Sequence, residues 1–177
     1  MKQILKITNI DNFNKYIVKI NDFLSDLIYE YPCHHIWFEG VVSELRDNQK
    51  NEREILFVVN DKDKIIGVSI LKKTEFEKKI CTLRVANEYQ KRGLGTMLVK
   101  ESCRLLETDT PIISVSQTRI NEFIRLFKRF GFVLEKVYCG KYRPMINEYC
   151  YNGILMPESI LKQNMIVDKP SLMNHSA

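Results

Sequence analysis

Apolar residues recur every three to four positions along four stretches of the chain, which places them on one face of an α-helix. The predicted helices cover residues 12–31, 36–45, 94–107 and 120–130. Short apolar runs between them have the length of β-strands. The predicted strands cover residues 4–7, 55–59, 64–71, 80–85, 112–116, 132–138 and 148–155. This order of elements predicts an α/β protein in which helices flank a mixed sheet.

One stretch of this pattern is suited to hold phosphates. The strand at 80–85 runs through a polar turn into the loop 90–95, Gln-Lys-Arg-Gly-Leu-Gly, and the loop opens directly into a helix. A helix start presents unpaired N–H groups and the positive end of the helix dipole. The two glycines of the loop carry no Cβ, so an anion can approach the backbone closely, and the Lys and Arg add positive charge. The stretch therefore predicts a site for a phosphorylated ligand.

The spacing of these glycines excludes two common phosphate loops. The pattern of Gly, four residues and Gly-Lys-Ser/Thr is absent, and the dinucleotide fingerprint fails because Leu98 takes its third glycine position. The loop resembles instead the acetyl-CoA loop of the GNAT (Gcn5-related N-acetyltransferase) family, Gln/Arg-x-x-Gly-x-Gly/Ala. The order of elements over residues 1–155 and the Gly-Phe ending of the segment 129–132 also resemble that family. The resemblance implies a mainly antiparallel mixed sheet and an N-acetyltransferase that uses acetyl-CoA as co-substrate.

The same resemblance assigns residues to the cofactor by their position. They are Leu83, Arg84 and Val85 for the pantetheine arm; Gln90, Lys91, Arg92, Gly93, Leu94, Gly95 and Thr96 for the pyrophosphate; and Asn121 and Phe127 on the last helix. Their contacts in the strand and the loop would be made by backbone groups, including a Val85 amide that would stabilise the oxyanion. Ser114 and Ser116 would lie near the slot for the thioester.

The acid that protonates the leaving thiolate departs from the family pattern. Many members carry a tyrosine four residues before the glycine of the Gly-Phe motif, and here that position is Phe127, which cannot donate a proton. We therefore expect Tyr142 or Ser116 to serve as the acid, with Tyr138 as a further candidate. A thiolate that leaves without help is also compatible with the sequence.

A general base is needed because the attacking amine must be neutral, and a lysine-like amine has a pKa near ~10.4. Family members often place a glutamate on the central strand, where this chain has Cys81 and Thr82. The candidates elsewhere in the chain are Glu148, Glu39, His34 and His35, each of which also has a structural interpretation. The acceptor would lie between the first two helices and the final hairpin. The residues expected to line its site are Trp37, Phe38, Tyr142, Arg143 and Tyr149.

Composition narrows the class of protein. The chain of 177 residues is 45% hydrophobic and 28% charged, which suits one soluble domain at 1–155 with a polar tail at 156–177. We expect no membrane association and no secretion signal, because apolar runs are short and charges interrupt the N-terminus. Five cysteines without a close pair favour the cytoplasm, and Cys33-His34-His35 lacks a second cluster that would indicate a metal site.

Two alternatives to an amine acetyltransferase stay open. The missing tyrosine is compatible with a non-catalytic module of the same fold that binds acyl-CoA as a sensor or scaffold. The net charge of +5 would suit a nucleic acid, but a ligand with several phosphates explains it better. A homodimer formed through the final hairpin and the tail is also compatible with the sequence.

Overall fold

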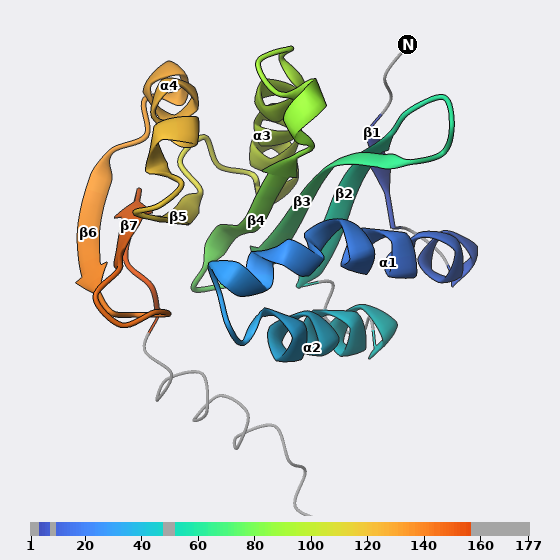
Figure 1. Cartoon of the computed structure of the whole chain (residues 1–177), viewed down its shortest axis with the longest axis horizontal. Coiled ribbons are helices and arrows are strands. Elements are labelled where there is room, and N and C mark those ends of the chain that lie inside the picture. Colours follow the sequence, from blue (N-terminus) through green and yellow to red (C-terminus); the bar gives the residue numbers. More distant parts are fainter. Residues whose placement is uncertain (1–3, 8–9, 48–51, 157–177) are drawn as a thin grey trace, which may run out of the picture.

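The computed structural model describes residues 4–7, 10–47 and 52–156, except for the side chains of residues 10 and 11 (Figure 1). Within them, seven strands form one sheet in the order β1-β2-β3-β4-β5-β7-β6. The strands are β1 Ile4–Lys6, β2 Arg53–Val59, β3 Ile65–Lys73, β4 Lys78–Val85, β5 Ile112–Ser116, β6 Leu134–Cys139 and β7 Asn147–Tyr151. The helices are α1 Ile10–Leu24, α2 His34–Asp47, α3 Leu94–Leu106 and α4 Ile120–Phe130, with the 3-10 turns η1 Ser25–Tyr29 and η2 Asn87–Tyr89.

The sheet is antiparallel except at its centre, where β4 and β5 run parallel. These two strands pair only through Lys79 with Ile112 and Ile80 with Ile113. On its other side, β4 carries a register irregularity at Cys81, because Ile80 and Thr82 oppose consecutive residues of β3. Beyond Ile80 the two central strands separate, and this division of the sheet creates the space for a ligand.

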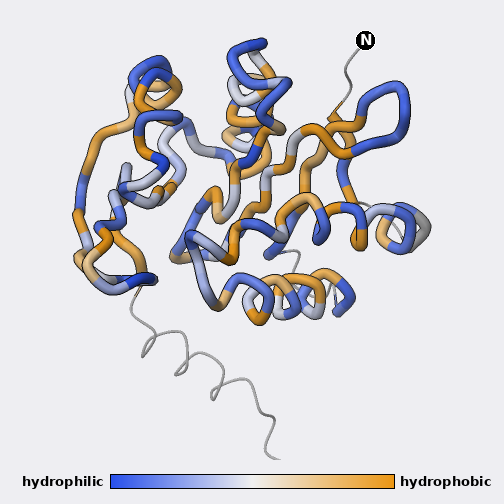
Figure 2. Tube along the Cα trace, viewed as in Figure 1, coloured by the Kyte–Doolittle hydropathy of each residue, from blue (hydrophilic) through white to orange (hydrophobic). Residues whose placement is uncertain are grey.

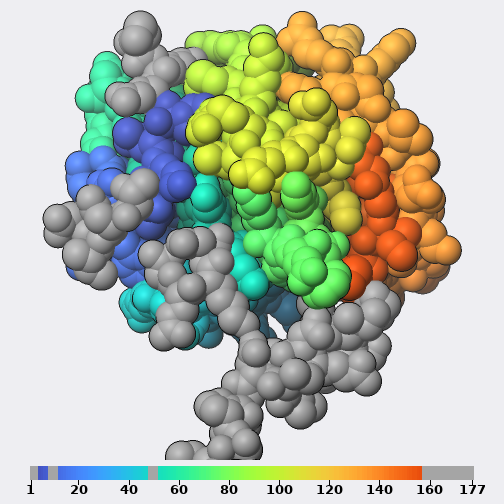
Figure 3. All heavy atoms as spheres, turned by 180° about the vertical axis from the view of Figure 1, so that it is seen from behind, coloured from blue at the N-terminus to red at the C-terminus, as the bar shows by residue number. Residues whose placement is uncertain are grey.

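Helices cover both faces of the sheet, and each face has its own apolar core (Figure 1). On one face, α3 and α4 bury residues such as Leu98 and Phe127 against the strands. On the other face, α1 and α2 pack Ile20 and Phe38 against the central strands, whose apolar residues appear as orange tube in Figure 2. Seen from behind, the end of α3 and the segment leading to β5 (yellow) lie between the N-terminal strand and the final hairpin (Figure 3). The layers confirm the predicted fold class.

The element order is confirmed, and the main difference lies at the end of the first helix. The pattern predicts one helix over 12–31, but α1 ends at Leu24 and the chain continues as η1. The Ser25 hydroxyl donates to the Asp22 carbonyl at 2.8 Å, a local bond of the kind that competes with regular helix. Next to it, Asp26 forms an ion pair with Arg84 of β4. The tighter turn brings the following residues, up to Tyr31, over the gap between β4 and β5.

The final hairpin is shorter than predicted. β7 ends at Tyr151 instead of continuing to residue 155. The chain then turns back, and the Leu155 amide donates to the Tyr138 hydroxyl at 2.9 Å. This contact engages the Tyr138 hydroxyl, and Leu155 and Met156 lie against the large cleft of the molecule. Nearly all of the predicted tail, residues 157–177, lies outside the described residues.

Candidate active site

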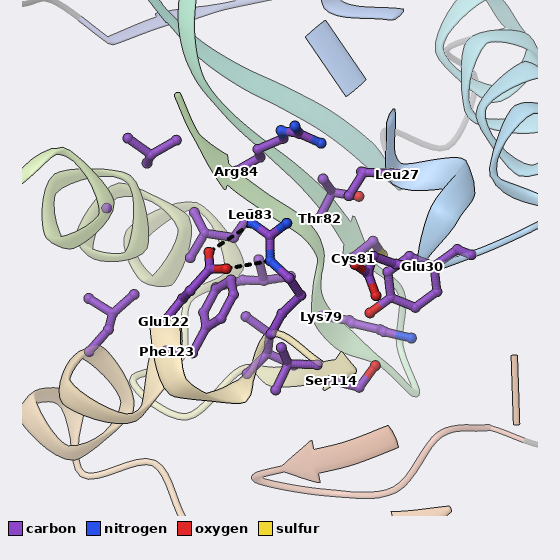
Figure 4. A pocket seen from close by; sticks show the side chains of 18 of the residues that line it. Leu27, Glu30, Lys79, Cys81, Thr82, Leu83, Arg84, Ser114, Glu122 and Phe123 are labelled. Carbon is purple, nitrogen blue, oxygen red and sulfur yellow. Dashed lines mark hydrogen bonds and ion pairs between the residues drawn. The ribbon is translucent and has the colours of Figure 1, made fainter. Parts of the chain in front are cut away.

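A cleft of about 1330 Å³ occupies the gap between β4 and β5. Its walls come from η1 and the start of α2, from β4 and β5, from the start of α3, from α4, and from the loop that precedes β7. Figure 4 shows Glu122 and Phe123 of α4 at one end, and Glu30, Lys79 and Ser114 at the other. The cleft therefore joins two chemically different halves across the divided sheet.

The edge of β4 that faces β5 offers backbone groups to a ligand, apart from the Val85 carbonyl, which accepts from the Gln90 side chain. Among the described residues, no strand pairs with this edge beyond Ile80. Leu83, Arg84 and Val85 all line the cleft there. Buried N–H and C=O groups need partners, and an extended ligand with amide groups can supply them as an added strand would.

The loop before α3 places the start of that helix on the cleft. Gly93 has φ +83°, a conformation that side chains disfavour, and it precedes the first turn of α3. The Gln90 side chain donates to the Val85 carbonyl at 3.2 Å and so fixes the loop to β4. Gly95 and Thr96 of the first turn line the cleft. The free N–H groups of this turn and the helix dipole therefore favour an anion here.

The charge of the lining fits such an anion. Among the described residues, nine Lys and Arg and three Glu line the cleft. Lys91, Arg125 and Arg129 lie around the start of α3, and Arg129 donates to the Thr96 hydroxyl at 3.3 Å. This half of the cleft can hold a ligand that carries several phosphate charges.

Behind the lining of the other half lies a buried carboxyl group, Glu148 on β7, which is only 3% exposed and does not itself line the cleft. The Tyr31 hydroxyl donates to its Oε1 at 3.3 Å, and the Ser114 hydroxyl also interacts with it. Burial raises the pKa of Glu148 from 4.5 to about 7, although these two hydroxyls and the charge of Lys79 act in the opposite direction. A carboxyl group with a pKa near neutrality can accept and release a proton at physiological pH.

Two tyrosines stand beside this carboxyl group at the cleft. The rings of Tyr31 and Tyr142 meet edge to face with centroids 5.2 Å apart, and both side chains line the cleft. Burial of the two hydroxyls and the negative charge of Glu148 raise the pKa of each above its ordinary value of 10, although the Tyr142 residue as a whole is 41% exposed. Both phenols therefore hold their protons and can act as hydrogen-bond or proton donors.

Residues 52–134 match the sequence model of the acetyltransferase (GNAT) domain, a stretch that runs from β2 to the start of β6 and includes the loop before α3. Over this stretch, 83 of the 177 residues, the chain is similar to GNAT acetyltransferases. The match assigns acyl transfer as the class of its activity. Sequence comparison with curated proteins finds no match for this chain.

Solved structures show the same fold at low sequence identity. A protein from Desulfovibrio desulfuricans assigned to the GNAT family is 18% identical, with a TM-score of 0.63 over 85% of this chain and 97% of that one. The PaiA N-acetyltransferase of Thermoplasma acidophilum, in complex with coenzyme A, is 16% identical, with a TM-score of 0.60 over 85% and 97%. A protein from Bacillus anthracis assigned as a streptothricin acetyltransferase, in complex with acetyl coenzyme A, is 18% identical, with a TM-score of 0.50 over 58% and 63%.

The cleft brings together most of the residues expected at the cofactor. Those that line it are Leu83, Arg84, Val85, Gln90, Lys91, Gly93, Gly95, Thr96 and Asn121. Arg92 is exposed outside the cleft, near the Tyr89 ring, and Leu94 is buried in the core. Phe127 does not reach the cleft, because it packs against Phe123, Phe132 and Tyr151. Its neighbour Phe123, one helical turn earlier, lines the cleft in its place.

Of the candidate acids and bases, some line the cleft and others lie outside it. Tyr142 lies in the cleft, whereas Ser116 is buried beside it with its hydroxyl 3.0 Å from that of Thr118. Ser114, two residues earlier on the same face of β5, lines the cleft. Glu39 and His35 are exposed on α2 outside it.

His34 lines the cleft and is buried, and burial lowers its pKa, so the imidazole is neutral. Trp37 also lines the cleft, but Phe38 and Tyr149 pack in the cores. Arg143 contacts Glu30 at 3.5 Å, at the rim of the cleft. No group of His, Cys, Asp or Glu in the described part of the chain could hold a metal ion, and no described helix could span a membrane.

The sequence pattern did not identify two residues of the site, Tyr31 and Lys79. Tyr31 reads as the last apolar position of the first helix, and Lys79 as part of an exposed charged turn. The proline that follows Tyr31 was a usable signal, because a residue that ends a helix before proline can point away from the helix face. Lys79 gave no such signal, since its place depends on where β4 and β5 separate.

Proposed function

We propose that this protein transfers the acetyl group of acetyl-CoA to a primary amine, with Glu148 as general base. The observation that carries the proposal is the near-neutral carboxyl group of Glu148, which accepts a hydrogen bond from Tyr31, a residue that lines the cleft together with Tyr142. A module that only binds acyl-CoA has no need for such a group. The structures of similar fold that hold coenzyme A or acetyl coenzyme A support the choice of co-substrate.

The cofactor would lie across the cleft, with its pyrophosphate on the start of α3 and its pantetheine arm along the free edge of β4. Lys91, Arg125 and Arg129 would neutralise the phosphates. A backbone N–H of the β4 edge, at Val85 by resemblance to the family, would stabilise the oxyanion. This placement directs the thioester toward the half of the cleft that contains Tyr142 and adjoins Glu148.

In the reaction, the amine nitrogen attacks the thioester carbonyl carbon, a C–N bond forms and the C–S bond breaks. Glu148 accepts the proton that the amine loses, directly or through the Tyr31 hydroxyl that donates to it. Tyr142 donates a proton to the leaving thiolate. Because both phenols keep their protons at neutral pH, Tyr142 can act as the acid. It would replace the tyrosine that many family members carry at the position of Phe127.

The first test is binding of acetyl-CoA by isothermal titration to the wild type and to Gly95→Asp. A Cβ at Gly95 meets only ordinary contacts with Leu126 and Val85, so the variant is expected to fold, and a carboxylate in the first turn suits the helix dipole. That carboxylate would stand in the anion site, so we expect at least a hundredfold loss of affinity. Gly40→Asp is the matched control, because Gly40 faces open space on α2.

Binding lost in Gly95→Asp and kept in Gly40→Asp would support the cofactor site, and acetylation of primary amines, followed by mass spectrometry, would then test the transfer. A folded wild type that binds no acetyl-CoA would overturn the proposal.

The described cysteines are all free, which agrees with the expected cytoplasmic location. That location and the homodimer stay predictions.

A further inference from the structure

The acceptor half of the cleft has a charge pattern that selects among amines. We propose that the acceptor carries an anionic group one or two carbons from its amine, as an amino acid does, and that Lys79 binds this group. The inference rests on the proposed function, because it concerns the second substrate of the same site.

The carboxylates that line the cleft are already paired with cations. The nitrogen–oxygen distances of these ion pairs are 3.5 Å for Arg143 with Glu30, 2.8 Å for Lys72 with Glu77, and 2.6 Å for Arg119 with Glu122. The ion pair of Glu77 is buried, with both side chains less than a fifth exposed. A polycationic acceptor would have to compete with these pairs, because Glu148 nearby is buried and already accepts a hydrogen bond from Tyr31. The lining therefore disfavours an acceptor with several positive charges.

Lys79 shows the opposite pattern. It is half-buried on β4 at the point where the sheet divides, and its side chain lies at the same end of the cleft as Ser114 and Glu30 (Figure 4). In the described part of the chain, its ammonium has neither a hydrogen bond nor an ion pair. Arginines of the same half have partners, since Arg84 pairs with Asp26 and Arg53 with Glu44. A half-buried ammonium without a partner favours an anion from the ligand.

The position of Lys79 also limits the size of the acceptor. Lys79 lies opposite Ile112 of β5, and Ser114, two residues further along that strand, lines the cleft with Lys79 and interacts with Glu148. An acceptor that places its amine at Glu148 and its anion at Lys79 must hold the two groups close together. The ammonium of Lys79 would also disfavour the protonated form of the amine, which helps to supply the neutral nucleophile.

The experiment compares amino acids with the amines that lack their carboxylate: leucine with isoamylamine, tyrosine with tyramine, and β-alanine with ethylamine. Spermidine represents a polycationic acceptor. Acetylated products are measured by mass spectrometry with saturating acetyl-CoA, and kcat/KM is compared within each pair. One ion pair of about 1.4 kcal/mol gives a tenfold preference, so we expect at least one amino acid to exceed its partner amine tenfold or more.

Three variants assign the preference to its residue. Lys79→Met should remove it, and Lys79→Arg should retain part of it. Lys141→Met removes a second, exposed lysine of the cleft and should leave the preference in place. An affinity for acetyl-CoA that is unchanged in all three variants would show that they are folded.

The outcomes distinguish this inference from the proposed function. Acetylation of amines without a preference for the carboxylated partners would overturn the inference and leave the acetyltransferase in place. A preference that survives Lys79→Met, or that disappears in Lys141→Met, would overturn the role of Lys79. Binding of acetyl-CoA without transfer to any amine would overturn the proposed function itself, and the inference with it.

Discussion

Replacing Glu148 by glutamine tests the proposed base through the stability of the fold as well as through activity. The substitution keeps the size and shape of a side chain that is only 3% exposed, and it removes the titration. In the wild type, burial raises the pKa of this carboxyl from 4.5 to about 7. At 1.36 kcal/mol for each pKa unit, ionisation of this group costs about 3 kcal/mol more in the folded state than in the unfolded chain.

The sign of the effect follows from which state holds the proton. Between pH 4.5 and 7 the unfolded chain has lost a proton that the folded chain still binds at Glu148. The contribution of this group to the free energy of unfolding therefore falls as pH rises through this window, and it is constant above it. Glutamine does not titrate, so we expect Glu148→Gln and the wild type to be similar near pH 5. Near pH 8 the variant should be more stable by about 2–3 kcal/mol.

The assay is urea unfolding at pH 5, 6.5 and 8, followed by the fluorescence of Trp37, the single tryptophan of the chain. Glu135→Gln is the control, because Glu135 is exposed on β6 and the same chemical change there should give no pH-dependent difference. Acetyl transfer should fall at least about a hundredfold in Glu148→Gln. For the wild type, kcat/KM should rise with pH up to about 7.

A stability difference between Glu148→Gln and the wild type that does not change with pH would refute the raised pKa. A wild type that is the more stable protein at pH 8 would show that Glu148 is an ionised and well-paired carboxylate. In either case the group would not be poised near neutrality, and the assignment of the base would have to be withdrawn.

Two further predictions concern the proton donor and the core. Tyr142→Phe should lower kcat about a hundredfold and leave the affinity for acetyl-CoA unchanged, while Tyr29→Phe, at a side chain 75% exposed, should leave kcat as in the wild type. An unchanged kcat in Tyr142→Phe would remove this tyrosine from the chemistry. Leu98→Ala should reduce the free energy of unfolding by about 2–5 kcal/mol, because Leu98 is fully buried between α3 and β3. Ile124→Ala, at a side chain 48% exposed, should cost about 0.5 kcal/mol in the same urea titration, and equal losses would contradict the described core.

The elements of the fold could be predicted because their signals are local. The helix at 120–130 and the strand at 112–116 have the bounds that their apolar patterns predict. The loop at 90–95 was recognisable for the same reason, since its glycines, its cations and the helix that follows are adjacent in the chain. Prediction failed where a local pattern met a tertiary contact. The first helix tightens into η1 beside the ion pair of Asp26 with Arg84, a partner 58 residues away.

By itself, the sequence determined the order of the elements, the glycine-containing loop at 90–95 before a helix, and the resemblance to the GNAT family. Only the tertiary structure decided the chemistry of the half of the cleft next to Glu148. Tyr31 and Glu148 are 117 residues apart in the chain and meet at 3.3 Å in the fold. The pKa of Glu148, and the lack of a partner for Lys79 among the described residues, depend on burial and on neighbours in space. Residue type and spacing along the chain do not contain these quantities, because they arise only when β4 and β5 separate and distant segments close around the gap.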